Sequence, residues 1–199
     1  MEIIGLSGCK SGSGKTELGL MLLENLRRKT GIMKGEIEEG KSGLVTDDSQ
    51  IMRAENPGIS PYLQSEAENV VYLRAQAENI KSALDKALGY FNDLDYLLIE
   101  GDDLIISLDP GVIIYVDEDG EEDEKCREVR ERADLILNYT ELHDSSQLND
   151  IDVSVPKSEI SCYRAQLISD ILGWGYGEFG RLLDREDIRV RRCQLGLFN

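Results

Sequence analysis

The first side chains able to do chemistry lie in a glycine-rich stretch near the start of the chain. In order, the stretch reads Cys9, Lys10, Ser11, Gly12, Ser13, Gly14, Lys15 and Thr16. It follows an apolar run, residues 3–6, and precedes leucines at helical spacing from Leu18 to Leu26, so we expect a strand, a turn and a helix. The backbone N–H groups of such a turn point inward at a helix N-terminus, where they bind phosphate groups.

Two side chains of this stretch have the types that phosphate chemistry needs. We expect Lys15 to neutralise the β- and γ-phosphates of a nucleoside triphosphate, and the Thr16 hydroxyl to bind Mg²⁺. The residues expected to contact the nucleotide are Ser11, Gly12, Ser13, Gly14, Lys15 and Thr16. Cys9 departs from the usual motif, which has glycine there, although Gly8 precedes it. The alternative is a glycine turn that only joins a strand to a helix.

A carboxylate ends a second apolar run. Residues 95–99 are typical of a buried strand, and Glu100 follows them, with Gly101 and Asp102 next. A carboxylate at the end of a strand beside a phosphate loop commonly holds Mg²⁺ through its water shell. We therefore expect Glu100 in the metal shell, with Asp102 as the second choice. The alternative is an exposed acidic turn.

Two more polar residues lie between these segments. Lys34 ends a short expected strand, residues 32–34, at the sheet edge where open α/β sheets bind ligands, so it is a candidate contact to phosphate or substrate. The alternative is an ordinary strand-terminal lysine. Residues 35–46 contain three glycines among charges and are expected to form a mobile loop. Asp48 follows it, and we expect this carboxylate to orient the attacking water or to join the Mg²⁺ shell, while it also suits a helix N-cap.

The remaining apolar pattern predicts the fold class. Further strands are expected at residues 70–73, 112–116, 135–138 and 151–155, and helices at residues 76–91, 125–133 and 158–172. Strands interleaved with helices predict an α/β fold, with a mostly parallel sheet of about seven strands and helices on both faces. We expect this domain over residues 1–172, with a C-terminal extension, residues 173–199, packed on it.

The composition argues against some kinds of binding partner and predicts the cellular compartment. The 199 residues carry a formal net charge of -17, which argues against nucleic acid or anionic lipid as the main partner. No apolar run approaches the ~20 residues that a membrane span needs, and no leader precedes the first strand, so we expect a cytoplasmic protein without membrane contact. The spacing of the cysteines indicates neither a disulfide framework nor a zinc site; they are Cys9, Cys126, Cys162 and Cys193.

The run that begins at Lys10 resembles the motif of a known protein family. The run from Lys10 to Thr16, with a lysine five residues before Lys15, resembles the deviant phosphate loop of the signature-lysine ATPases. That group includes septum-positioning, plasmid-partition, arsenite-pump and nitrogenase iron proteins. In these proteins the early lysine reaches across a homodimer to the partner's nucleotide, so the resemblance implies a nucleotide-dependent homodimer in which Lys10 contacts nucleotide and is catalytic. The alternative is a solvated charge on an exposed loop.

A second resemblance covers residues 1–160. Several motifs in order are similar to the branch of the phosphate-loop superfamily that contains dethiobiotin synthetase, the molybdopterin-guanine dinucleotide biosynthesis B protein, and the urease and hydrogenase maturation GTPases. These motifs are the phosphate loop, Met33-Lys34, Asp48-Ser49, Ile99-Glu100-Gly101 and the strand ending in Asn138. The resemblance implies the phosphate-loop NTPase fold and a part in metal-cofactor assembly.

The identity of the base stays open at Asn138. This residue ends the expected strand 135–138 and offers a donor and an acceptor to a base edge, so it is a candidate nucleotide contact. In the maturation GTPases the corresponding segment, Asn-Lys-x-Asp, reads guanine. Here Tyr139 replaces the lysine and Glu141 the aspartate, so ATP and GTP are both candidates.

These features lead to three functional hypotheses. The first is a Mg²⁺-dependent nucleoside triphosphatase, working as a homodimer, that assists the making or insertion of a metal cofactor such as molybdopterin and has a metallo-cofactor enzyme as partner. The second is an ATP-dependent small-molecule kinase or ligase resembling dethiobiotin synthetase, with Lys34 binding an anionic substrate. The third is a non-catalytic nucleotide-binding adapter that docks a partner through residues 173–199.

Overall fold

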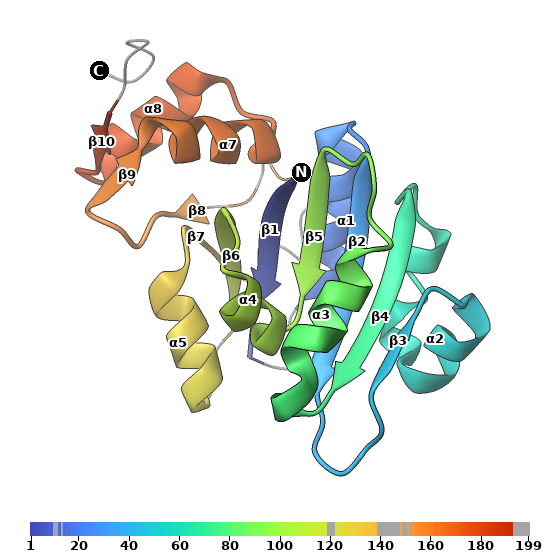
Figure 1. Ribbon diagram of the computed structural model, residues 1–199. Coiled ribbons are helices and arrows are strands. Elements are labelled where there is room, and N and C mark those ends of the chain that lie inside the picture. Colours follow the sequence, from blue (N-terminus) through green and yellow to red (C-terminus); the bar gives the residue numbers. More distant parts are fainter. Residues whose placement is uncertain are drawn as a thin grey trace.

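An eight-stranded sheet forms the centre of the structure. The computed structural model describes residues 1–9, 12, 14–118, 122–138, 148, 151 and 153–192. The strands of this sheet are β1 (Glu2–Ser7), β2 (Thr30–Ile37), β3 (Leu44–Thr46), β4 (Asn69–Ala75), β5 (Tyr96–Glu100), β6 (Val112–Asp117), β7 (Leu135–Asn138) and β8 (Val153–Ser154). Their spatial order is β3-β4-β2-β5-β1-β6-β7-β8, which places β1 between β5 and β6 (Figure 1).

The sheet is mixed but mostly parallel. Strands β4, β2, β5, β1, β6 and β7 pair in parallel, and only the two edge strands run the other way, β3 against β4 and β8 against β7. The expected α/β class and mostly parallel sheet are therefore confirmed. The expectation of about seven strands is one short for this sheet, because the short strand β3 pairs at the edge of β4.

Helices cover both faces of the sheet. They are α1 (Lys15–Leu26), α2 (Ser49–Glu55), α3 (Ile80–Leu88), α4 (Asp102–Leu108), α5 (Glu124–Arg132), α7 (Cys162–Leu172) and α8 (Tyr176–Arg185), with the 3-10 turns η1 (Pro57–Ile59), η2 (Tyr62–Gln64) and η3 (Ala77–Asn79). In Figure 1, α1 lies behind the sheet, and α3 and α4 lie in front of it. Successive strand residues point to opposite faces, so Leu98 joins the cluster under α1 and Ile99 joins the cluster under α3 and α4.

The C-terminal part of the described chain packs on the α1 face. Helix α7 contacts α1, and α8 contacts α7. A separate parallel pair, β9 (Glu159–Ser161) and β10 (Arg189–Arg191), flanks these helices. The buried Asp134 carboxylate ties this part to the sheet, because one oxygen accepts hydrogen bonds from Lys157 and Arg164 at 2.5 and 3.1 Å, while the other accepts from the Ile113 backbone N–H at 2.9 Å.

Three local expectations are corrected by the structure. Residues 35–46 are not one loop, because β2 continues through Ile37 and β3 begins at Leu44, both paired with β4. Pairing with β4 keeps these residues in strands, although their glycines favour a loop. Helix α4 begins at Asp102, where no helix was expected, and two acidic residues in its first turn complement the helix dipole. The helix expected from residue 158 begins at Cys162, after β9.

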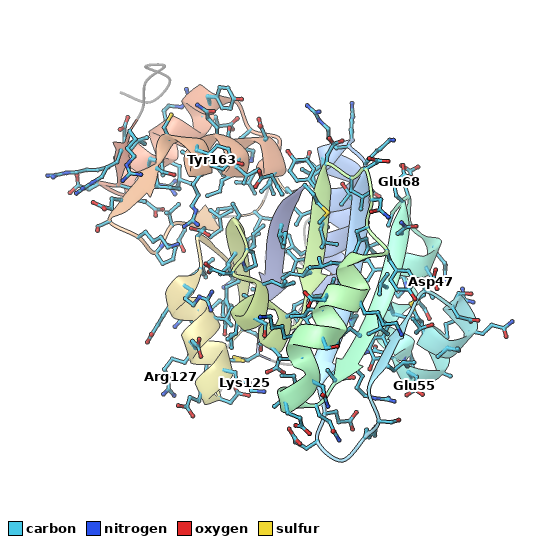
Figure 2. All side chains as sticks on the ribbon, viewed as in Figure 1. Asp47, Glu55, Glu68, Lys125, Arg127 and Tyr163 are labelled. Atoms are coloured by element: carbon cyan, nitrogen blue, oxygen red, sulfur yellow. A yellow bond between two sulfur atoms is a disulfide. The ribbon has the colours of Figure 1, made fainter. Side chains whose placement is uncertain are left out.

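Charged side chains cover the outside of the molecule. Among those labelled in Figure 2, Glu68, Lys125 and Arg127 are exposed. In the part of the chain that the structure describes, every helix is too short or too polar to cross a bilayer.

Gly101 sets the change of direction between β5 and α4. Its φ is +140°, a value that side-chain-bearing residues rarely adopt. A Cβ atom at this position would lie 2.1 Å from the Gly35 carbonyl oxygen of the neighbouring strand β2. Glycine is therefore required by both the backbone conformation and the close approach of two main chains.

We expect Gly101→Ala to lower the free energy of unfolding by about 3 kcal/mol or more, because strain and a backbone clash act together. Urea unfolding followed by circular dichroism measures the change. Gly177→Ala is the matched control, since a Cβ atom there meets no atom within 4 Å and the residue lies in α8. The control is expected to be neutral or stabilising by up to about 1 kcal/mol. Equal stability of the two variants would contradict the role assigned to Gly101.

Candidate functional site

The register of the sheet places the main polar residues side by side. Lys34 on β2 pairs with Glu100 on β5, and Glu100 pairs with Leu6 on β1. Parallel neighbours end at the same edge of a sheet, so the ends of β2 and β5 flank the turn that leads from β1 into α1. Thr16, in the first turn of α1, therefore lies above the same edge.

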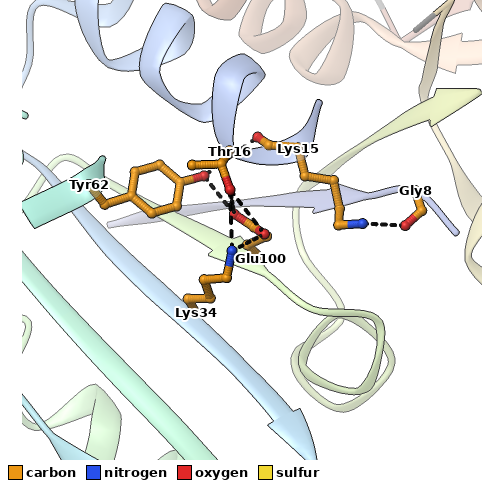
Figure 3. A network of polar contacts seen from close by, with 6 residues as sticks. All are labelled: Gly8, Lys15, Thr16, Lys34, Tyr62 and Glu100. Carbon is orange, nitrogen blue, oxygen red and sulfur yellow. Dashed lines mark hydrogen bonds and ion pairs between the residues drawn. The ribbon is translucent and has the colours of Figure 1, made fainter. Parts of the chain in front are cut away.

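Glu100 is the centre of a polar network (Figure 3). Its carboxylate is 5 % exposed, and its Oε1 atom accepts a hydrogen bond from Lys34 Nζ at 2.5 Å. The other oxygen, Oε2, accepts from Thr16 Oγ1 at 3.1 Å and from Tyr62 Oη at 2.8 Å. Lys34 Nζ also donates to Thr16 Oγ1 at 3.2 Å. The structure thus brings together three of the residues that the sequence singled out, from three different elements.

Tyr62 is the member of this network that the sequence did not reveal. It comes from η2, is 1 % exposed and lies with its hydroxyl against Glu100, and burial followed by the Glu100 charge raises its pKa well above 10. Its ring fits because residue 19 of α1 is glycine: a Cβ atom there would lie 2.2 Å from Tyr62 Oη. A glycine inside a predicted helix was the available signal of such a close approach.

Lys15 lies on the other side of the same helix start. Its Nζ atom donates a hydrogen bond to the carbonyl oxygen of Gly8 at 2.5 Å (Figure 3). This hydrogen bond joins the residue that begins α1 to the residue that follows β1. Burial lowers the pKa of Lys15 below its usual value, and the nearby Glu100 and Asp102 carboxylates oppose this shift. An ammonium group at a helix N-terminus is in a suitable place to bind an anion such as phosphate.

The loop glycines have the backbone that phosphate loops require. Gly12 and Gly14 have φ values of +90° and +79°, and Gly14 is the N-cap residue of α1. The expected roles of Lys10, Ser11 and Ser13 lie outside the described residues. Glycine at both described positions leaves the main chain able to turn and its N–H groups able to face a ligand.

Asp48 and Asn138 lie away from the Glu100 network. The Asp48 carboxylate caps α2, where it accepts hydrogen bonds from the N–H groups of Gln50 and Ile51 at 2.8 and 3.2 Å. The N-cap interpretation is confirmed, and the expected contact of Asp48 with water or metal stays a prediction. Asn138 is exposed at the end of β7, two strands from β1 and in register with Asp117 on β6. Its expected contact with a base also stays a prediction.

Asp102 forms a second polar group on the opposite face of the sheet. Its Oδ1 atom accepts a hydrogen bond from the buried Ser7 hydroxyl at 2.6 Å. Burial raises the pKa of Asp102, although this hydrogen bond and the charge of Lys15 oppose the shift. Its other oxygen lies 3.7 Å from Cys126 Sγ.

Cys126 and Cys9 form a disulfide, which corrects the expectation drawn from cysteine spacing. Their Cα atoms are 5.4 Å apart although 117 residues separate them in the chain. Sequence spacing does not reveal such a pair, because the pairing of β1 with β6 is what brings the turn after β1 next to α5.

A comparison with known protein families and with curated protein sequences finds no match to this chain. The side-chain network therefore carries the functional argument. Two hollows on the described surface lie elsewhere: one of about 810 Å³ between α1 and residues 61–66, and one of about 430 Å³ beside α8 and β10. Neither is lined by Thr16, Lys34 or Glu100.

Lys34→Met is expected to lower the free energy of unfolding by about 3 kcal/mol, because it leaves the Glu100 carboxylate buried without its cation. Lys41→Met is the matched control, since Lys41 pairs with Glu38 where both side chains are exposed, and a change below about 1 kcal/mol is expected. Chemical denaturation measures both. The double variant Lys34→Met, Glu100→Gln is expected to recover part of the loss. A loss for Lys34→Met no larger than that of the control would contradict the arrangement.

Asp102→Asn tests the effect of burial on titration. A raised pKa means that the folded protein binds the proton more strongly than the unfolded chain, so stability falls as pH rises from the unfolded pKa, 3.8, through the folded pKa. The variant is expected to lack this decrease and to gain stability relative to wild type above that interval. Urea unfolding at several pH values measures it, with the exposed Asp85→Asn as control. A wild-type stability that rises with pH relative to the variant would refute the assignment.

Proposed function

We propose that this chain is a Mg²⁺-dependent nucleoside triphosphatase that binds ATP or GTP at the turn between β1 and α1. The observation that carries the proposal is the contact between the Thr16 hydroxyl and the Glu100 carboxylate, 3.1 Å apart at the start of a helix that follows a glycine turn. A hydroxyl and a strand-end carboxylate at that place are the protein groups by which phosphate-loop enzymes hold magnesium.

The residues of the site fit magnesium bound together with a nucleotide. Mg²⁺ takes oxygen ligands, keeps several waters and is usually held by one or two carboxylates plus substrate phosphates. Thr16 supplies a hydroxyl oxygen and Glu100 a carboxylate, and when bound the ion neutralises charge on the phosphates. The Lys34 ammonium, which compensates the Glu100 charge in this structure, has Thr16 Oγ1 as a second partner at 3.2 Å.

The chemistry that follows is positioning and charge stabilisation. Lys15 and the loop N–H groups bind the β- and γ-phosphates, and they stabilise the charge that spreads over the transferring phosphoryl group. Asp48 is proposed to orient the attacking water, and Lys10 to reach the nucleotide of a second copy in a homodimer. The support for these two roles is the sequence resemblance described above.

The resemblance also suggests the process that the activity serves. The ordered motifs resemble proteins that assemble or insert metal cofactors, and we propose the same kind of task here, with a metallo-cofactor enzyme as partner. A small-molecule kinase or ligase is the second candidate, and the half-buried Lys34 beside Thr16 and Glu100 favours it, because an anionic acceptor would need a cation near the γ-phosphate. Phosphate release that increases strongly with an added acceptor metabolite would favour this candidate over hydrolysis.

Lys15→Ala is expected to weaken Mg²⁺-nucleotide binding by at least about a hundredfold, because it removes the cation that faces the phosphates. Isothermal titration with ATP, GTP and CTP, each with Mg²⁺, measures the affinity and identifies the base. Lys81→Ala removes an exposed lysine of α3 and is expected to bind as wild type does. Unchanged affinity and turnover in the Lys15 variant would overturn the proposed function.

A further inference from the structure

We propose that Cys9 and Cys126 form a thiol–disulfide exchange site, and that closing the disulfide tightens nucleotide binding. The inference rests on the proposed function, because it concerns the regulation of the same loop. It starts from the position of the pair: the two cysteines link the entrance of the phosphate loop to helix α5.

Cys9 lies next to the residue that Lys15 contacts. The carbonyl oxygen of Gly8 accepts the hydrogen bond from Lys15 Nζ, and Cys9 is the following residue. The Cys9 sulfur lies 2.9 Å from Tyr115 Oη on β6, so it points toward α5 and β6. A bond at this sulfur therefore fixes the main chain at the loop entrance without placing the sulfur among the Glu100 network.

Cys126 supplies a rigid attachment point. It lies in the first turn of α5, and its N–H donates to the N-cap carboxylate of Asp123 at 2.8 Å. Its side chain is 1 % exposed, while its neighbours Lys125 and Arg127 are exposed (Figure 2). Cys9 is only partly buried, so an outside thiol or disulfide reaches Cys9 first.

The exchange balances with a small-molecule disulfide as oxidant. The Cys9 thiolate attacks one sulfur of that disulfide and releases one small thiol, and the Cys126 thiolate then attacks Cys9 Sγ and releases the second. Two protein thiols are oxidised to one disulfide and the small-molecule disulfide is reduced to two thiols, with both protons retained by the products. A small dithiol reverses the reaction by attack at Cys9.

Two carboxylates lie near Cys126. Asp102 Oδ2 lies 3.7 Å from Cys126 Sγ, and Asp123 caps the same helix turn. Paired cysteines in reducing compartments are usually transient or redox-sensing, and one such pair at the loop fits that use better than a stabilising framework does.

The effect on binding follows from chain entropy. A crosslink at Cys9 restricts the main chain where it enters the loop, so less backbone freedom at this residue is lost when nucleotide binds. Fixing the backbone of one residue is equivalent to about tenfold in an equilibrium constant. The oxidised protein is therefore expected to bind Mg²⁺-nucleotide about tenfold more tightly than the reduced protein.

The test compares the full chain in oxidised glutathione and in dithiothreitol. Intact mass reports the loss of two hydrogens on oxidation, and titration with Mg²⁺-ATP and Mg²⁺-GTP gives the affinity in each state. Cys126→Ala and Cys9→Ala are expected to bind as the reduced protein does under both conditions. Cys162→Ala changes a buried cysteine of α7 and is expected to keep the tenfold response.

Two results would overturn the inference alone: equal affinity in states whose masses differ as expected, or a mass that the reagents leave unchanged in the folded protein. A Cys162→Ala variant that loses the response would also overturn it. Failure of every nucleotide to bind in either state would instead overturn the proposed function, and the affinity effect with it.

Discussion

The arrangement of the site depends on one buried carboxylate. Glu100 has Lys34, Thr16 and Tyr62 as partners, and these come from β2, α1 and η2. The attraction between Glu100 and Lys34 is strong in this dry environment, but the loss of hydration offsets much of it, so the pair contributes more to geometry than to net stability. Because each donor has one direction in which it reaches the carboxylate, the network sets how the helix, the strand and the turn lie relative to one another.

This network also brings two lysines together in an acidic protein. The chain has a net charge of -17, yet Lys15 and Lys34 lie close together at the edge of the sheet. Lys34 pairs directly with Glu100, and the Glu100 charge also acts on Lys15, so the carboxylate offsets the repulsion between the two ammonium groups.

The sequence predicted the parts of the site that follow from regular elements. A strand, a glycine turn and a helix place Thr16, and two apolar strands place Lys34 and Glu100, so their convergence follows from parallel pairing alone. Tyr62 was not predictable in this way because η1 and η2 have no periodic pattern. The disulfide was not predictable because its 117-residue separation leaves no local spacing. In the fold, β3 and the end of β2 were missed because glycines and charges obscure strands that only pairing with β4 stabilises.

The central position of β1 has a consequence for how the chain folds during synthesis. Its partners are β5 and β6, so Glu2 must pair with Tyr96 and Ser7 with Tyr115. Such distant pairing slows folding, because a long loop must close before the contacts form. During synthesis the first strand therefore leaves the ribosome well before either neighbour exists, and its apolar edges stay open until the middle of the chain has emerged. Nascent chains of this protein are accordingly exposed to aggregation over that interval, and chaperones that shield short apolar segments would act at its N-terminus.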